Sequence, residues 1–89
     1  MERVLNARDV VTAIRSALDG TTSKAQLGHW AFSAMLADDT KSVPYEHRHK
    51  REIHAALLRL MMMEEGPEYE LDDTALGALI DQLERLRAQ

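Results

Sequence analysis

The apolar residues of this chain recur every three or four positions in four segments, a pattern typical of amphipathic helices. These segments span about residues 7–19, 24–37, 44–65 and 73–87. No run of alternating apolar and polar residues is long enough to indicate a β-strand. Short polar connections separate the segments. The pattern therefore predicts an all-α fold, an antiparallel four-helix bundle, formed by a single helical domain over residues 1–89.

Local sequence features indicate where several of these helices begin and end. Asn6 is a favourable helix-capping residue, and Ser23 followed by Gln26 three positions later forms a capping box. Asp72 precedes the last helix and is the predicted cap there. Gly20 follows the first helix, where its access to positive φ favours termination. The turn after Gly20 is short, so we expect the first two helices to be antiparallel neighbours.

The core must be built mainly from aliphatic side chains and methionine, because the chain has only one Trp, one Phe and two Tyr. Trp30 belongs to the apolar stripe of the second segment, and we expect it to anchor the core. Met61, Met62 and Met63 cannot all face one core, because consecutive helical residues point in different directions. We therefore expect at least one of them to be exposed or at the core boundary, where flexible thioethers suit an adaptable contact surface.

Composition excludes several classes of function. The chain has no cysteine, so it forms no disulfide, thiolate nucleophile or cysteine-based zinc site, which agrees with the cytoplasm as the predicted location. The first six residues contain no long apolar stretch, so we predict no signal peptide. No aliphatic run approaches the length of a membrane span. The net charge of −4 also disfavours a general nucleic-acid binder, so neither membrane nor nucleic acid is an expected partner.

Negative charge is concentrated at the junction between the third and fourth segments. Residues 64–73 hold six acids and no base: Glu64, Glu65, Glu68, Glu70, Asp72 and Asp73. Asp72 and Asp73 lie at the start of a helix, where the helix dipole favours acids. Glu64 and Glu65 lie near the end of a helix, where the dipole disfavours them. Stability alone would favour bases at those positions, so the junction indicates a surface that meets a cationic partner.

Other candidate chemistries fit the sequence less well. His47 and His49 are two positions apart, so on a helix they point about 200° apart, and with His54 they suit a basic surface better than a metal site. No Gly-rich phosphate loop or Gly-x-Ser-x-Gly motif occurs. We therefore predict no metal, no cofactor and no enzymatic activity. A helix-turn-helix at Gly20 would place Lys24 as the only base early in the recognition helix, which disfavours DNA reading.

A short motif occupies the C-terminal quarter of the chain: Tyr69-Glu70-Leu71-Asp72-Asp73, then Leu76 and an amphipathic helix that ends in basic residues. Gly20, Thr22-Ser23 and Trp30-Ala31 add a looser match, and residues 37–63 add none. Together these motifs resemble the colicin D immunity protein family. The resemblance implies an antiparallel helical bundle that protects a bacterium from a tRNA-cleaving toxin. It further implies that acidic side chains occupy the basic active site of the toxin and stand in for RNA phosphates.

The resemblance and the charge pattern together define a predicted toxin-binding set. Tyr69, Glu70, Asp72 and Asp73 lie at matched positions, whereas Glu64, Glu65 and Glu68 match in charge and region only. The expected partner is a basic nuclease toxin domain, bound by a monomer in a 1:1 complex. The alternative is a small, non-enzymatic helical interaction or regulatory module that self-associates, or binds another protein, through Met61–Met63.

Overall fold

The computed structural model describes residues 4–87, and within them the chain is all-α with four α-helices. These are α1 (Ala7–Leu18), α2 (Lys24–Asp39), α3 (Lys50–Met61) and α4 (Asp73–Arg87). Three short 3-10 helices accompany them: η1 (His47–His49), η2 (Met62–Glu64) and η3 (Pro67–Tyr69). None of the helices in the described range is both long and apolar enough to cross a bilayer. The first three residues, part of the stretch predicted to contain no signal peptide, lie outside the described residues.

Reciprocal capping hydrogen bonds confirm the predicted starts of α1 and α2. The Asn6 side chain accepts from the backbone N–H of Asp9, and the Asp9 carboxylate accepts from the backbone N–H of Asn6, each at 3.0 Å. Ser23 and Gln26 make the equivalent pair at 3.0 and 2.7 Å. These bonds satisfy amide groups that the first helical turn leaves without partners, and losing such a cap typically costs about 1 kcal/mol.

The third helix begins later than predicted, at Lys50 and not near Pro44. Leu5 and Tyr45 form an isolated parallel β-bridge. The backbone N–H of Leu5 donates to the Pro44 carbonyl at 2.9 Å, and the backbone N–H of Glu46 donates to the Leu5 carbonyl at 2.7 Å. This pairing holds residues 44–46 extended and occupies the Pro44 carbonyl, which would accept a backbone bond in a helix that began there.

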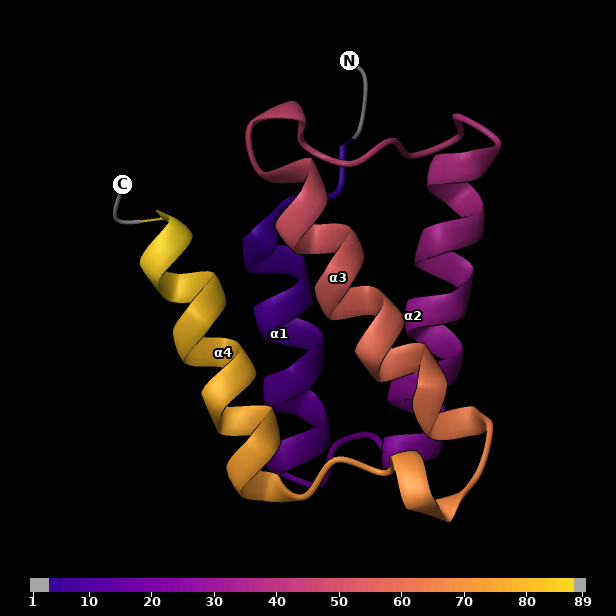
Figure 1. Cartoon of the computed structure of the whole chain (residues 1–89), viewed down its shortest axis with the longest axis vertical. Helices are drawn as coiled ribbons and strands as arrows, with labels where there is room; N and C mark the ends of the chain where they lie inside the picture. Colours follow the sequence, from indigo (N-terminus) through magenta and orange to yellow (C-terminus); the bar gives the residue numbers. More distant parts are fainter. Residues whose placement is uncertain (1–3, 88–89) are drawn as a thin grey trace.

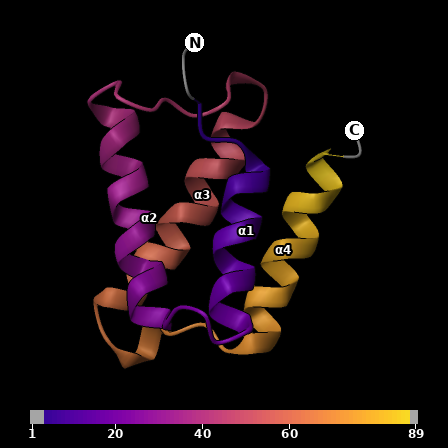
Figure 2. The ribbon, with the colours of Figure 1, turned by 180° about the vertical axis from the view of Figure 1, so that it is seen from behind.

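The helices pack mainly as two pairs, α2 with α3 and α1 with α4. Each helix runs in the direction opposite to the one before it in the chain (Figure 1). Seen from behind, α1 lies between α2 and α4 (Figure 2). All four helices contribute to one core, whose largest fully buried side chains are Val10, Val11, Ile14, Ile53, Leu57, Leu60, Leu76 and Leu83. The expectation that α1 and α2 are close neighbours holds at their turn, but each packs more extensively on another helix.

The predicted core anchor, Trp30, is only partly buried and packs at the edge of the core. It lines a cleft between α1 and α2, so Trp30 contacts the core, as expected, but from its edge and not from its interior. The three methionines are all half-buried, and Met61 and Met63 pack against the core. They therefore lie at the core boundary, as expected from their consecutive positions.

Candidate functional site

The acidic junction, residues 64–73, lies at one end of the molecule beside the turn between α1 and α2 (Figure 1). The chain leaves α3 through η2, turns at Gly66, forms η3 and then enters α4. Local backbone bonds of 2.9–3.2 Å hold this path; their donors are the amides of Glu65, Tyr69 and Glu70 and their acceptors the carbonyls of Met62, Gly66 and Pro67. The acidic side chains are thus presented by a segment with defined local structure.

Three of the six carboxylates make contacts with the start of α2 or α4. The Asp72 side chain accepts from the backbone N–H of Ala75 at 2.8 Å, which confirms Asp72 as the N-cap of α4. The Lys24 ammonium lies 3.8 Å from the Glu70 carboxylate and 3.5 Å from the Asp73 carboxylate. Exposed ion pairs of this kind contribute about 0–1 kcal/mol each. Lys24 therefore orients these two acids but adds little stability.

Glu64 has a mixed environment, because its side chain lies over the contact between α2 and α3. A Cβ atom at Gly28 would be 3.1 Å from the Glu64 Cγ and 3.2 Å from the Leu60 carbonyl oxygen. The Glu64 carboxylate also lies 3.7 Å from the His29 Nδ1, an ion pair only when the imidazole is protonated. Gly28, an unexpected residue within a predicted helix, is thus explained by the close approach of these elements.

Glu65, Glu68 and Tyr69 project into solvent. Within residues 4–86 neither Glu65 nor Glu68 forms an ion pair with a basic side chain. The Glu68 carboxylate folds over Gly66, where an added Cβ would lie 2.8 Å from its Oε2. The exposed Tyr69 ring supplies an amphipathic contact residue of the kind enriched at protein interfaces. Of the seven predicted residues, these three form the fewest side-chain contacts with the rest of the described chain.

The two ends of the molecule differ in charge. Asp19, at the end of α1, lies at the same end as the acidic junction (Figure 2). Hydrogen bonds from the Thr21 side chain and backbone lower the pKa of Asp19, so this carboxylate also stays ionised. The opposite end is mixed: its bases Lys41, Arg48, Lys50 and Arg51 lie among the acids Asp38, Asp39 and Glu46. The acidic end therefore has the stronger single-sign charge.

The histidines do not converge on a metal site. His49 is buried while His47 is exposed, although both belong to η1. The His54 Nδ1 instead lies 3.2 Å from the Tyr45 hydroxyl oxygen. In the part of the chain that the structure describes, no three His, Asp or Glu side chains are arranged to hold an ion. The exposed His47 and His54 fit the predicted basic surface, whereas His49 does not, because its side chain is buried.

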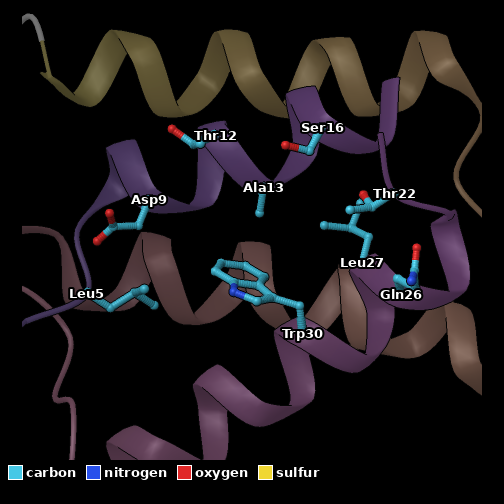
Figure 3. Close-up of a pocket in the computed structure, with 9 residues that line it drawn as sticks. All are labelled: Leu5, Asp9, Thr12, Ala13, Ser16, Thr22, Gln26, Leu27 and Trp30. Carbon is cyan, nitrogen blue, oxygen red and sulfur yellow. The ribbon is translucent and has the colours of Figure 1, made fainter. Parts of the chain in front are cut away.

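The cleft beside Trp30 was not anticipated from the sequence. It has a volume of about 370 Å³, and its walls come from α1, α2 and the segments that lead into them. Figure 3 shows the indole ring next to Ala13, with Asp9, Thr12 and Ser16 on the α1 wall. The cleft exists because α1 and α2 each pack mainly on another helix. The small residues Ala13 and Ser16 on the α1 wall were the only sequence feature that could have indicated this cleft beside the indole ring.

Sequence reasoning also missed an apolar surface on α2 and α3. Phe32 and Leu36 on α2 and Leu58 on α3 are large apolar side chains, and all three are exposed. Phe32 and Leu36 are one helical turn apart. They flank the predicted buried stripe of their helix, so their spacing alone could have indicated a second apolar face.

Comparison of the chain with protein-family models, with curated proteins and with solved structures found no significant match. Function is therefore inferred from the charges and geometry of this chain and from the motif that begins at Tyr69.

Proposed function

We propose that this chain is a non-enzymatic immunity protein that binds and inhibits a cognate bacterial nuclease toxin through the acidic junction. The observation that carries the proposal is the exposure of Glu65 and Glu68, without basic partners among residues 4–86, beside the exposed Tyr69. The resemblance of Tyr69–Asp73 to the colicin D immunity protein family supports a tRNase as the toxin. A cytoplasmic location and a 1:1 complex are parts of the same proposal.

The chemistry of an RNA-cleaving site explains how such a surface would inhibit. A nuclease cleft gathers Lys, Arg and His side chains that bind phosphate and stabilise the charge developing in the transition state. Carboxylates placed in that cleft accept charge-assisted hydrogen bonds from the same donors. Glu65 and Glu68 would enter the cleft, while Lys24 holds Glu70 and Asp73 at its rim. Inhibition would then result from exclusion of RNA.

The charge distribution also favours rapid capture. A concentrated patch of one sign steers a partner of the opposite sign and raises the association rate, most strongly at low salt. The backbone bonds within the acidic junction reduce the ordering that binding requires. Both properties suit an inhibitor that must neutralise a toxin before it cleaves RNA.

The proposal is tested first in cells and then with purified proteins. The chain is co-expressed with each nuclease domain encoded beside its gene, and growth and intact tRNA are measured. Association kinetics are then compared for the wild type and for Glu65→Lys combined with Glu68→Lys. At low salt we expect the double variant to associate about tenfold more slowly or worse, with a weaker salt dependence.

Glu52→Lys combined with Asp81→Lys is the matched control, because it makes the same change in net charge at exposed helical positions outside the junction. We expect its association rate to stay within about threefold of the wild type. Equal slowing by both double variants would remove the acidic junction from the contact. Failure to protect against every neighbouring nuclease would contradict the function itself.

A further inference from the structure

The outer face of α2 and α3 carries three large, exposed apolar side chains. Phe32, Leu36 and Leu58 are 46%, 52% and 42% exposed, respectively. A groove of about 270 Å³ lies between the two helices, with Phe32 and Leu36 on one wall and His54 and Met61 on the other; Met35, Asp38, Asp39 and Tyr45 also line it. Leu58 lies on the same face of α3 as that second wall, four positions after His54 and three before Met61. Contiguous apolar surface of this kind commonly marks a protein interface.

The charges on this face of α3 are arranged about Leu58. Arg51 precedes Leu58 by seven residues and Glu65 follows it by seven, a spacing that returns to nearly the same side of a helix. The helical path continues past α3, because η2 follows directly and Glu65 keeps right-handed helical angles of φ −78° and ψ −20°. Arg51 and Glu65 are both exposed, and neither forms an ion pair within residues 4–86.

Phe32 lies level with Leu58 along the molecule. Gly28 faces Leu60 and Glu64, and α2 and α3 run in opposite directions (Figure 1). Phe32 follows Gly28 by four residues, so its level on α3 is about four residues before the midpoint of Leu60 and Glu64, which is Leu58. The largest apolar side chains thus occupy the middle of the face, with an exposed base towards one end and an exposed acid towards the other.

We propose that this face is a two-fold interface between two copies of the chain. A two-fold axis at the level of Leu58, perpendicular to α3, sets the helix antiparallel to α3 of the second copy. Leu58 then meets its own symmetry mate, and Arg51 meets the partner subunit's Glu65. The same operation brings Phe32 and Leu36 against the partner's α2. The second copy fits because an isologous contact needs a self-complementary surface, and the spacing about Leu58 supplies one.

This inference goes beyond the proposed function, because it assigns a contact made by the protein without its toxin. Glu65 belongs to both surfaces. A toxin bound at the acidic junction and a second copy bound on α3 would therefore exclude each other, and a 1:1 toxin complex would form from the released monomer.

Sedimentation velocity of the full chain tests the interface without any toxin. We expect the wild type to sediment as a dimer, and Arg51→Glu and Glu65→Arg each to raise the dimer dissociation constant about tenfold or more. In an equimolar mixture of the two variants, a mixed dimer would again join a base to an acid at both of its charged contacts, so the dimer should re-form. Recovery on mixing cannot result from misfolded variants, because an unfolded chain would not regain its partner.

Glu52→Arg is the control, since residue 52 is exposed but points away from Leu58 around the helix. This variant should remain dimeric. A monomeric wild type at the highest soluble concentration would overturn the interface. Variants that stay dimeric, or that stay monomeric when mixed, would overturn the pairing of Arg51 with the partner's Glu65.

Discussion

Tyr45 ties the connection between α2 and α3 to the core. The residue is 5% exposed, its backbone N–H donates to the Asp38 carboxylate at 2.9 Å, and its hydroxyl lies 3.2 Å from the His54 Nδ1. Burial, aided by the negative charge of Asp38, raises the pKa of Tyr45 to about 12. The phenol therefore helps to place the segment that delays the start of α3, and its protonation state is coupled to folding.

The raised pKa of Tyr45 predicts a loss of stability in alkali. An unfolded tyrosine loses its proton near pH 10, whereas the folded chain keeps the proton until about pH 12. The folded state binds more protons in this window, so the free energy of unfolding falls as pH rises from about 10 to about 12. Tyr45→Phe should cost about 1 kcal/mol at neutral pH through the lost hydrogen bond, and its stability should fall less steeply over the alkaline range.

Urea denaturation at a series of pH values measures this difference. Tyr69→Phe, which changes an exposed ring, is the matched control and should keep the alkaline dependence of the wild type. Equal alkaline slopes for the wild type and Tyr45→Phe would show that the phenol does not titrate with folding.

Two glycines within helices have opposite environments. Gly28 of α2 faces the Leu60 carbonyl oxygen of α3, which would lie 3.2 Å from an added Cβ. At Gly77 of α4 no atom other than its chain neighbours and the surrounding helical backbone lies within 4 Å of that position. The first glycine permits close helix packing, and the second only weakens a helix.

Alanine substitutions should therefore change stability in opposite directions. Gly77→Ala should raise the free energy of unfolding by about 0.5–1 kcal/mol through helix propensity. Gly28→Ala should lower it by about 1 kcal/mol, because the backbone of α3 must move and overpacking exceeds the gain in propensity. Chemical denaturation of the two variants beside the wild type measures both changes. A stabilising Gly28→Ala would show that α2 and α3 separate at little cost.

The helices that could be predicted closely are those whose limits depend on nearby residues. The caps at Asn6, Ser23 and Asp72 each act within three positions, so spacing along the chain identified them. The start of α3 depends on the bridge between Leu5 and Tyr45, which are distant in sequence. No local pattern contains that pairing, so the predicted helix began too early.

The candidate site likewise has one feature that the sequence predicted and one that only the tertiary structure determines. Charge density at residues 64–73 was evident from composition, but the sequence did not indicate which acids have partners. Lys24 reaches Glu70 and Asp73 only because the start of α2 lies beside the acidic junction. Tertiary structure therefore decides that only Glu65, Glu68 and Asp72 among the six acids are free of basic partners within the described residues, and Asp72 instead caps α4.

At the scale of the whole molecule, the acidic side chains and the apolar core occupy different regions. The core extends through all four helices, while the acidic junction gathers repelling carboxylates at one end. Their mutual repulsion is tolerable because the side chains are exposed and screened by solvent. The proposed toxin and the proposed second copy would both use Glu65, so the acidic end would also control whether the protein is free or self-associated.

Lys24 offers a test of whether that charge serves recognition or stability. Lys24→Gln removes the base that pairs with Glu70 and Asp73 and makes the acidic end more negative. We expect a loss of about 1 kcal/mol of stability or less, because both pairs are surface pairs, but faster capture of a basic toxin at low salt. Stopped-flow association at several salt concentrations measures the rate. Lys41→Gln, at the opposite end, is the control and should leave the rate near the wild-type value. Slower association of Lys24→Gln would mean that the orientation of these two carboxylates matters more for capture than the total charge of the acidic junction.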